Sequence, residues 1–462
     1  MDAPLSHMDR RRPPAPQPQE QKLGPIGLYR ALRANAITVW RREAFEEPFI
    51  VDRGLLGEYV IVNEPDAIRR VFIDNAANYR KDRLSLEKLG PAIGEGLLTS
   101  EAEHWRLQRR TVAPLFQPQA VQAYLAAMAG ATEAMLARWE REAGGGAVLD
   151  VAREMTALTY DIIARTVFSS EIETPADVMG AAITEYFDAL GRIDLWDVLP
   201  LPRWLPRPAM IGARSAVTVF REEVRRLLAR RRAKQASGAA LPDDLVTRLM
   251  TARDPETDAP LSDAVIHDNL VTFIGAGHET TANALGWTFF LLSEFPETDA
   301  QVAAEVRAEF RSPSADDLAR LNHTRMVLEE AMRLYPPVPL LSRQAVAADR
   351  FGDVEVKRGA RVIVSPWVLH RHRRLWEDPE LFVPERFSPE RRATIPRFAY
   401  LPFGAGPRIC VGNTFALQEA TLVLAQVTQR FRLRLVEDTE VMPVARMTLR
   451  PGNGLPMRVL RR

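Results

Sequence analysis

The sequence predicts a mainly α-helical protein with a small β region, and three observations lead to this fold class. Apolar residues recur at helical spacing along most of the 462 residues, strand-like runs are few and short, and Pro- or Gly-rich stretches are too short to separate domains. We therefore expect one domain over residues 22–462. The Pro-rich residues 1–21 are predicted to form a disordered leader.

Eight segments carry the helical period. In the longest of them Ser262 can cap the N-terminus and Pro296 ends the helix, which gives a length of about 50 Å at 1.5 Å per residue. Gly275 and Gly277 stand in its middle and each costs about 1 kcal/mol relative to Ala, so another group must approach the backbone or the helix must open. The segments are 66–72, 103–112, 118–143, 151–168, 175–190, 208–236, 262–295 and 323–334.

Four short runs have the alternating or β-branched pattern of strands and are bounded by turn residues. They lie at 59–62, 354–356, 361–365 and 457–460. Because they come from both ends of the chain, we expect one small sheet assembled from both ends.

Composition excludes several classes of function. Lys and Arg number 61 against 60 for Asp and Glu, so no overall field favours nucleic acid or an anionic membrane. The single cysteine excludes an internal disulfide and fits a reducing, cytoplasmic location. The most apolar window, 270–295, carries His278, Glu279 and Asn283 at its centre, so it is predicted to be buried in protein rather than to anchor the chain in a membrane.

The single cysteine, Cys410, lies directly before an amphipathic helix whose apolar stripe runs from Ala416 to Phe431. A helix N-terminus favours a thiolate, so we expect a lowered thiol pKa there. The neighbouring glycines would let a flat group approach the backbone, and Arg408 could pair with a carboxylate. The pattern F-x-x-G-x-R-x-C-x-G, which includes Phe403, Gly404 and Gly412, should occur by chance on the order of 10⁻⁴ times in such a chain.

This segment resembles the haem-binding signature of the cytochromes P450, and the resemblance extends from about Lys22 to the end of the chain. It implies the cytochrome P450 fold, with haem b between the long helix at 262–295 and the helix that follows Cys410. It also implies that the Cys410 thiolate is the axial ligand of the haem iron.

Further residues match the family's motifs. Glu330 and Arg333 match its E-x-x-R helix, and Arg386 in the P-E-R-F segment matches the arginine that completes a structural triad. The same E-x-x-R pattern also occurs at Glu103, Glu222, Glu223 and Glu355, but only the copy at Glu330 precedes Tyr-Pro-Pro at the family's spacing. Trp105, Arg109, Arg343 and Lys81 match, with Arg408, positions that contact the haem propionates.

The resemblance also implies a site for oxygen activation and a substrate pocket. Thr280 and Glu279 match the family's alcohol and acid, which would relay protons to bound dioxygen, beside Ala276 and Gly277. His278 is predicted to be a hydrogen-bonded buried residue and not an iron ligand. The pocket is expected to include variable parts of 83–98 and 179–201, together with Phe273, Ala276, Thr280, Val338, Pro339, Leu340 and Met447.

The resemblance thus predicts a monooxygenase that inserts one oxygen atom of O2 into a hydrophobic molecule such as a fatty acid or terpenoid. One cysteine cannot hold an iron–sulfur cluster, so electrons are expected from a separate ferredoxin or flavodoxin with its NAD(P)H reductase. Arg106, Arg110 and 371–374 could form a basic docking face. A peroxide-driven haem enzyme and a haem-binding protein without turnover remain alternatives.

Overall fold

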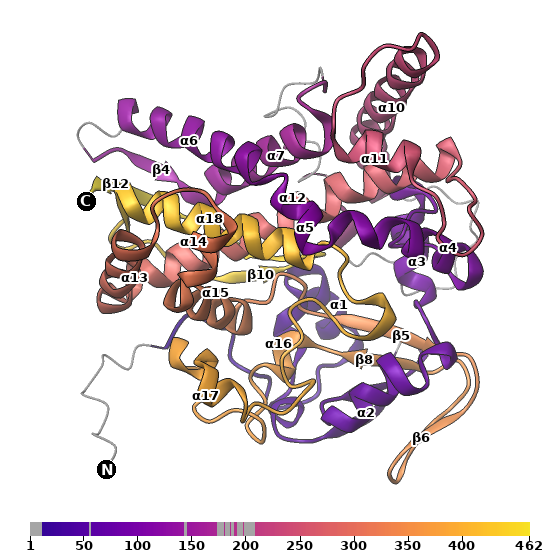
Figure 1. Cartoon of the computed structure of the whole chain (residues 1–462). Coiled ribbons are helices and arrows are strands. Elements are labelled where there is room, and N and C mark those ends of the chain that lie inside the picture. The colour runs from indigo at the N-terminus through magenta and orange to yellow at the C-terminus, as the bar shows by residue number, and fades with distance from the viewer. Residues whose placement is uncertain are drawn as a thin grey trace.

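The computed structural model describes residues 12–54, 57–142, 146–172 and 208–462, together with positions 180, 185, 189–191 and 197. Most of these residues form a helical body, and small sheets lie mainly at one side of it (Figure 1). The predicted fold class, mainly helical with a small β region, is confirmed.

The helices of the body follow the predicted segments closely, and α7 matches its segment in full. The predicted helix at 118–143 is divided into α5 and α6. The predicted helix at 175–190 lies almost entirely outside the described residues. The α-helices are α1 (Pro25–Ala34), α2 (Pro65–Arg69), α3 (Arg83–Ile93), α4 (Ala102–Val112), α5 (Pro118–Gln122), α6 (Leu125–Glu142), α7 (Val151–Phe168), α10 (Pro208–Ala236), α11 (Leu245–Thr251), α12 (Asp263–Glu294), α13 (Pro296–Glu309), α14 (Ala315–Arg320), α15 (Asn322–Leu334), α16 (Pro366–Leu369), α17 (Pro389–Arg392) and α18 (Asn413–Arg430).

Short helical turns join these elements. They are η1 (Ala36–Val39), η2 (Arg42–Phe45), η3 (Arg70–Asp74, a π-turn that continues α2), η4 (Ala76–Asn78), η5 (Ala113–Phe116), η6 (Pro384–Phe387) and η7 (Gly406–Arg408).

The strands in the described part of the chain form four small sheets rather than the single predicted sheet. The largest has the order β1-β2-β8-β5-β3 and does join distant parts of the chain, because β2 pairs in parallel with β8. The last predicted strand lies instead in a separate sheet of order β4-β12-β9. The strands are β1 (Phe49–Gly54), β2 (Gly57–Val62), β3 (Tyr79–Arg80), β4 (Val148–Asp150), β5 (Leu341–Ala345), β6 (Asp349–Phe351), β7 (Val354–Val356), β8 (Arg361–Val364), β9 (Phe431–Leu435), β10 (Pro443–Ala445), β11 (Leu449–Pro451) and β12 (Pro456–Arg461).

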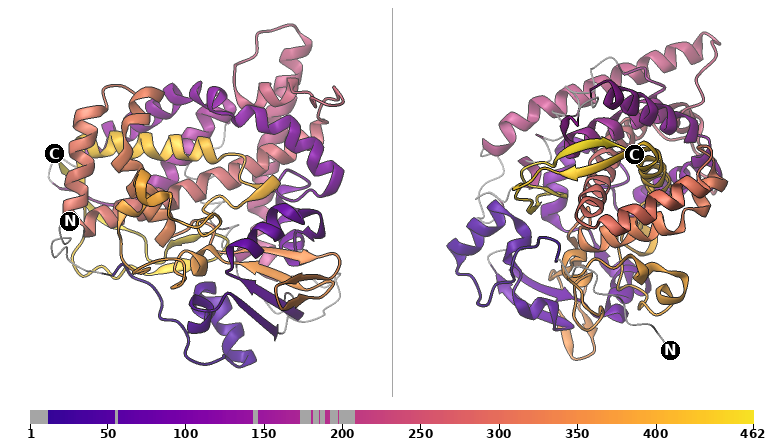
Figure 2. Two further views of the ribbon diagram at one scale, coloured as in Figure 1. Left: turned by 60° about the horizontal axis from the view of Figure 1, so that its bottom comes forward. Right: turned by 90° about the vertical axis from the view of Figure 1, so that its left-hand side faces the viewer.

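Helix α12 runs through the middle of the molecule and contacts α7, α10, α15 and α18 (Figures 1 and 2). It begins as predicted, because the Ser262 hydroxyl accepts the Val265 N–H, and it ends at Glu294 before Pro296. Its first half, up to Ile274, belongs to one buried apolar cluster with α7, α10 and α11. Its second half, from Ala282, belongs to another with α6, α15 and α18. The middle of the helix therefore lies where the two cores meet.

Part of the predicted leader, residues 13–19, contacts the helical body, and residues 1–11 lie outside the described residues. The Gln19 N–H donates to the Trp40 carbonyl at 2.9 Å, and the Tyr335 hydroxyl donates to the Pro14 carbonyl at 2.9 Å. Pro13 is buried. These contacts hold residues 13–19 on the body in spite of their proline content.

Among the helices that the structure describes, none combines the length and the hydrophobicity that a bilayer span requires.

Candidate functional site

The loop that carries Cys410 folds on its own backbone. The Cys410 N–H donates to the Phe403 carbonyl at 2.9 Å, and the Ile409 N–H donates to the Gly406 carbonyl at 3.0 Å. Gly404 and Gly406 have φ of +73° and +71°, which favours glycine at both positions. At Gly406 a Cβ would lie 1.9 Å from the Phe72 carbonyl oxygen, so this glycine also permits direct contact with η3.

The thiol of Cys410 is accessible although protein surrounds it. Burial raises its pKa, while the hydrogen bond from the Gly412 N–H and the charge of Arg109 oppose that rise. The net direction is upward, so the predicted lowering of the pKa by the helix N-terminus is wrong for the protein groups alone. Burial penalises the thiolate more than one N–H and one guanidinium stabilise it.

Beyond its accessible first turns, α12 has a stripe of four accessible residues in its otherwise buried middle. Between Asn269 and Ser293 the described side chains are buried except at Phe273, Ala276, Gly277 and Thr280. These positions share one helical face, and they lie where the two apolar cores meet. Such exposure in the middle of a 32-residue buried helix is typical of a helix that lines an interior site.

The Cys410 loop lies at the same junction. Val411, like Phe273 and Trp105, packs on the apolar cluster that contains the first half of α12. Phe403 and Phe415 pack on the cluster that contains its second half. Helices α12 and α18 also meet through a hydrogen bond between Thr281 and Glu419. The accessible stripe of α12 and the Cys410 loop are therefore neighbouring parts of one site.

Three cations gather at one edge of this site. The antiparallel pairing of β3 with β5 sets Arg80 opposite Gln344 and so brings Lys81 beside Arg343. Burial, followed by the charges of Arg343 and Arg408, holds the pKa of Lys81 well below its usual value. Burial and Arg408 lower the pKa of Arg343 to about 10.

The cations have few anionic partners. Glu101 accepts from Arg408 Nη2 at 2.8 Å and from the backbone N–H of Lys81 at 3.2 Å. Arg343 lies 5.0 Å over the Phe72 ring and donates to the Ser342 carbonyl. Asp82 is the second carboxylate that acts on Lys81 and Arg343. Three crowded cations beside two carboxylates would be stabilised by a further anionic group.

The residues present therefore fit a haem. The Cys410 thiol can ligate iron, the cation cluster can pair with two propionates, and the α12 stripe can face the opposite side of a flat ring.

Trp105 and Arg109 lie on α4 beside the Cys410 loop. The Arg408 guanidinium lies 4.3 Å over the Trp105 ring, and Arg109 donates to the Ile409 carbonyl at 2.9 Å. Both predicted contact residues are therefore next to the thiol. In the structure they support the loop, which the sequence did not predict.

The predicted acid and alcohol on α12 point to different partners. The Thr448 hydroxyl donates to Glu279 Oε1 at 2.8 Å, and Glu279 is 5% exposed. The Thr280 hydroxyl donates to the Ala276 carbonyl at 2.7 Å, within its own helix, and both residues belong to the accessible stripe. A Cβ on Gly277 would lie 3.2 Å from Ile163 Cδ1, so this glycine permits close packing on α7.

His278 is buried on the α7 side of α12. Burial lowers its pKa to about 4, so the ring is neutral at pH 7. Neither ring nitrogen has a hydrogen-bond partner among the described residues, which differs from the predicted hydrogen-bonded histidine. Tyr160 packs against its ring edge at 6.1 Å.

The structure brings the predicted triad together. Glu330 and Arg333 are fully buried and form a bidentate pair at 2.7 and 2.8 Å, and Arg386 Nε lies 3.5 Å from Glu330. Arg333 also donates to the carbonyls of His370, Pro379 and Leu381.

The triad supports the Cys410 loop through His370. The Leu401 N–H donates to His370 Nε2 at 2.8 Å, and Leu401 lies at the start of the loop. Arg333 holds the His370 backbone, so the chain of contacts runs from the triad to this histidine and then to the loop.

The predicted pocket residues lie around the same junction where they are described. Phe273 packs edge to face on Phe116 at 5.3 Å, and Met447 packs on the same core. Leu340 is 42% exposed, whereas Pro339 is buried and its carbonyl accepts from Ser365 at 2.8 Å. Val338 is half-buried, and most of 179–201 lies outside the described residues.

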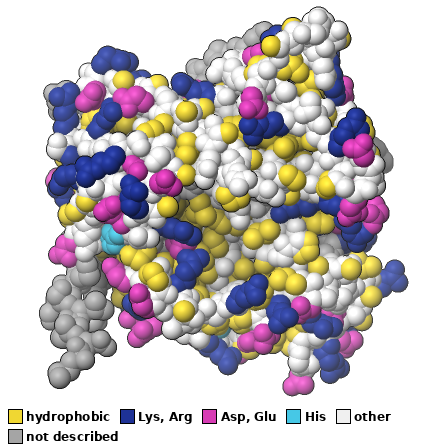
Figure 3. Space-filling model, in the orientation of Figure 1, with side chains coloured by type: hydrophobic (Ala, Val, Ile, Leu, Met, Phe, Trp, Pro, Cys, Tyr) yellow, Lys and Arg dark blue, Asp and Glu magenta, His cyan; other side chains and the backbone are white. Residues whose placement is uncertain are grey.

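The predicted basic docking face stays a prediction, because its residues differ in exposure: Arg106, Arg373 and Arg374 are exposed, whereas the others are half-buried or buried. Arg371 is 2% exposed and packs 3.6 Å over the Trp367 ring, and His372 is also buried. Arg110 pairs with Asp254 at 2.9 Å, Arg106 with Glu103 and Arg373 with Glu46. On the face drawn in Figure 3, cationic and anionic side chains are interspersed.

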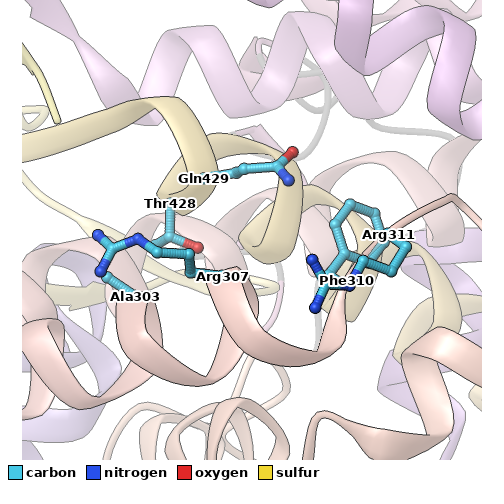
Figure 4. Close-up of a pocket in the computed structure, with 6 residues that line it drawn as sticks. All are labelled: Ala303, Arg307, Phe310, Arg311, Thr428 and Gln429. Carbon is cyan, nitrogen blue, oxygen red and sulfur yellow. The ribbon is translucent and has the colours of Figure 1, made fainter.

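A separate surface cavity of about 300 Å³ lies between α13 and the C-terminal end of α18 (Figure 4). Thr428 lies 15 residues after the start of α18, about 22 Å along the helix from the Cys410 end. The cavity is therefore distinct from the Cys410 site. Its lining residues are Ala303, Arg307, Phe310, Arg311, Thr428 and Gln429.

Several site residues were missed by the sequence reasoning. Glu101 is the counter-ion of the cation cluster, Thr448 binds the acid of α12, and Glu419 bonds to Thr281. Glu419 gave no signal beyond a charge in a helical segment, and Glu101 none beyond a charge just before one. Thr448 lies 169 residues from its partner Glu279, and no local sequence pattern predicts such a contact.

Comparison with known proteins gives a consistent result. The family model for cytochrome P450 matches residues 46–455. Cyclooctatin synthase of Streptomyces melanosporofaciens is 34% identical over 408 residues, which cover 86% of this chain and 84% of that protein. Cyclooctat-9-en-7-ol 5-monooxygenase of the same organism is 35% identical over 378 residues, 81% of this chain and 80% of that protein.

Pentalenene oxygenase of Streptomyces avermitilis is 30% identical over 403 residues, 86% of this chain and 87% of that protein. A solved structure, the haem domain of cytochrome P450DA, has a TM-score of 0.81 and 26% sequence identity, and covers 97% of this chain and 98% of that chain.

Proposed function

This chain belongs to the cytochrome P450 family and is a monooxygenase of that family, and we propose that it oxygenates a hydrophobic, terpenoid-like molecule at a haem ligated by Cys410. The observation that carries this proposal is the single accessible thiol, which lies at the junction of two apolar cores beside a cluster of three cations.

The haem, which we propose to be haem b, would be held from its two faces and one edge. Cys410 would ligate the iron, supported by Phe403, Gly404 and Gly412 of its loop. When bound, the thiolate-ligated iron would supply the binding and reductive cleavage of O2. The propionates would be bound by Lys81, Trp105, Arg109, Arg343 and Arg408.

The proton supply would come from α12. Thr280 is part of the accessible stripe beside Ala276. Its hydroxyl donates to the Ala276 carbonyl, so its oxygen remains able to accept one hydrogen bond from a water molecule that carries protons into the site. Glu279, buried and bonded to Thr448, would take up protons and pass them to water near Thr280. Gly277 is proposed to allow the helix to approach α7 closely and so to leave this face open.

The substrate pocket would be apolar. Phe273, Leu340 and Met447 contribute accessible apolar surface near the junction, and Val338 and Pro339 precede β5. Few polar groups here offer specific hydrogen bonds, so shape and apolar area would select the substrate. The three curated relatives, two named monooxygenase or oxygenase, support a terpenoid-like substrate over a fatty acid.

Members of this family receive electrons from a redox partner. We propose a separate ferredoxin or flavodoxin with its NAD(P)H reductase, and a cytoplasmic location in which such partners are found. Because Arg371 is buried and Arg110 is paired with Asp254, docking would depend on the exposed Arg106, Arg373 and Arg374 and on other surface cations near the Cys410 loop.

The test is turnover with labelled oxygen. The haem-loaded protein is supplied with a ferredoxin, its reductase, NADPH and either cyclooctat-9-en-7-ol or pentalenene under ¹⁸O2. One ¹⁸O atom in the product, dependent on the ferredoxin, is the expected result. A product formed only with hydrogen peroxide would replace the proposal by a peroxide-driven enzyme, and no product from these or other apolar terpenoids would overturn the substrate class.

A further inference from the structure

The loop from Gly94 to Ser100 rests on α12 through its backbone. Gly94 has φ of +62°, and a Cβ there would lie 2.0 Å from Asp268 Oδ2. A Cβ on Gly96 would lie 2.5 Å from Thr272 Oγ1 and 2.8 Å from the Asp268 carbonyl oxygen. No side chain fits between the loop and the helix at these two positions.

One carboxylate joins this loop to two helices. Asp268 Oδ2 accepts the Glu95 N–H at 2.9 Å, and Oδ1 accepts from Arg221 Nη2 at 3.0 Å. Arg221 lies on α10, and its Nη1 also donates to the Ala92 carbonyl at the end of α3 at 3.0 Å. His267 completes the group, with Nδ1 3.0 Å from Asp268 Oδ1 and Nε2 2.9 Å from the Arg221 carbonyl oxygen.

The carboxylate of Asp268 is the charged centre of these contacts. Burial raises its pKa, but the bonds from His267 and the Glu95 N–H and the charge of Arg221 outweigh that effect and lower it. Charge-assisted hydrogen bonds of this kind are about twice as strong as neutral ones. Asp268 therefore holds the loop more firmly than a neutral side chain could.

The other end of the loop reaches the cation cluster. The Leu98 carbonyl accepts from Lys81, and the Ser100 carbonyl accepts from Arg408 Nη1 at 3.0 Å. Between the two ends, Leu97 packs in the same core as Phe273. The loop thus spans the distance from α12 to the proposed propionate-binding residues along one side of the site.

We propose that Asp268 is a positioning residue that fixes the 94–100 loop and α10 to α12, and thereby sets how fast and how bulky a ligand can enter the pocket. Asp268 lies eight residues before Ala276, about 12 Å along α12, so it acts through the loop and touches no reacting group. This proposal rests on the proposed function, because it takes the α12 stripe as the pocket wall.

The test uses two azoles of different size as probes. Imidazole and 4-phenylimidazole bind a ferric haem iron directly, and the shift of the haem absorbance in a stopped-flow instrument gives their association and dissociation rates. For Asp268→Ala in the full haem-loaded chain, we expect both rates for 4-phenylimidazole to rise about tenfold, the factor given by loss of one charge-assisted hydrogen bond. Imidazole rates should change less than threefold. Equal effects on both azoles, or no effect, would overturn the proposal.

Two further variants keep the test decisive if Asp268→Ala folds poorly. Arg221→Met removes the same link from the α10 side, and Gly94→Ala displaces the carboxylate from the loop side. Both variants should raise the association and dissociation rates of 4-phenylimidazole more than those of imidazole, as in Asp268→Ala. Asp268→Asn keeps an acceptor for the Glu95 N–H but loses the charge that pairs with Arg221, so it should restore only part of the original rates. A merely structural role predicts no such selective rescue.

Asp263→Asn is the matched control. Asp263 pairs with Arg232 and so also joins α12 to α10, but no hydrogen bond or ion pair of the described residues joins it to the 94–100 loop, and it is 60% exposed. Its azole rates should stay within twofold of the unchanged protein. If it matches Asp268→Ala, the loop contact is not the cause and the proposal fails.

Failure of the proposed function can be distinguished from failure of the role proposed for Asp268. The reduced carbon monoxide spectrum of each variant reports thiolate ligation independently of azole entry. A missing thiolate band in the unchanged protein would reject the haem site itself. A normal band with unchanged azole rates would reject only the role of Asp268.

Discussion

The Cys410 loop and the 94–100 loop approach neighbouring elements in the same way, yet they are held by different kinds of contact. Gly406 and Gly94 both have positive φ, and a Cβ on either would lie about 2 Å from an oxygen atom of a neighbouring element. The Cys410 loop is closed by its own backbone, as in the Cys410 to Phe403 hydrogen bond. The 94–100 loop is held by the side chain of Asp268, more than 170 residues away.

The Cys410 loop and the buried triad therefore form a rigid side of the site, the Cys410 side. The 94–100 loop and α12 form a side that opens more easily, the α12 side. Local backbone bonds and a buried triad leave the Cys410 side with one geometry. Ion pairs that are partly exposed, such as Arg221 with Asp268, cost less to open. We expect substitutions on the Cys410 side to change stability and haem retention, and substitutions on the α12 side to change ligand entry and coupling.

The largest expected effect is on the buried triad. Arg333→Met leaves the Glu330 carboxylate buried without its bidentate partner, which should cost about 3–5 kcal/mol of unfolding free energy. Urea unfolding of the haem-loaded protein measures this. Arg325→Gln is the control, because Arg325 is 60% exposed and its pair with Glu329 should contribute less than about 1 kcal/mol. Equal losses in the two variants would contradict the fixed character of the Cys410 side.

Two buried histidines should make stability depend on pH: His278 on the α12 side and His370 on the Cys410 side. Burial lowers the pKa of His278 to about 4, and burial followed by Arg333 and Arg371 lowers that of His370 to about 3. Below about pH 6.5 both histidines bind protons in the unfolded chain but stay neutral in the folded protein. The free energy of unfolding therefore falls as the pH drops toward 4. A shift of this size corresponds to about 3 kcal/mol for His278.

Two substitutions separate the histidines. His278→Phe removes no hydrogen bond of the described residues, so the protein should lose part of its pH dependence at little cost at pH 7. His370→Phe deprives the Leu401 N–H of its acceptor and should cost about 1–3 kcal/mol at pH 7. Thermal unfolding at pH 5 and pH 7 distinguishes them, and an unchanged pH slope in His278→Phe would contradict the account.

A smaller effect is expected from the glycines of the Cys410 loop. In Gly404→Ala the nearest atom is 3.9 Å away, so only the positive φ is strained, at about 1–2 kcal/mol. Gly406→Ala adds a clash with the Phe72 carbonyl and should release haem more readily. Haem transfer to apomyoglobin measures the release, and identical rates for the two variants would mean that the contact with η3 does not matter.

The smallest effect on stability is expected at Thr280. Its hydroxyl bonds only within α12, so Thr280→Ala should change unfolding free energy by less than about 0.5 kcal/mol. Product formed per O2 consumed should fall about tenfold or more, because the relay loses its hydroxyl. Thr281→Ala is the neighbouring control: Thr281 bonds Glu419, so stability should fall while coupling stays. Full coupling in Thr280→Ala would remove this residue from the proton supply.

The sequence predicted most of the fold because its helices have long apolar stripes and clear ends. Ser262 and Pro296 marked α12 to within a residue, and Glu330 with Arg333 lay where a short local motif could be recognised. The division of the strands into several sheets was not predictable, since strand pairing joins residues such as Val60 and Val362 across the whole chain.

The site was predictable only where its residues lie close together in sequence. The Cys410 segment gave its own pattern, and Arg343 followed by its spacing from Arg333. Asp268 carried no signal, because its partners at Glu95 and Arg221 come from distant helical segments. The burial of Arg371 was missed for the same reason: the Trp367 ring and Glu380 that receive it are not implied by a basic run.

The central claim is that Cys410 is the thiolate ligand of a haem, and the reduced carbon monoxide spectrum tests it most directly. The purified protein is loaded with haem, reduced with dithionite and exposed to carbon monoxide, beside Cys410→Ser treated in the same way. We predict a Soret band well to the red of the histidine-ligated position in the unchanged protein and its loss in Cys410→Ser. A histidine-like band in the unchanged protein, or a thiolate band that survives in the variant, would contradict the account.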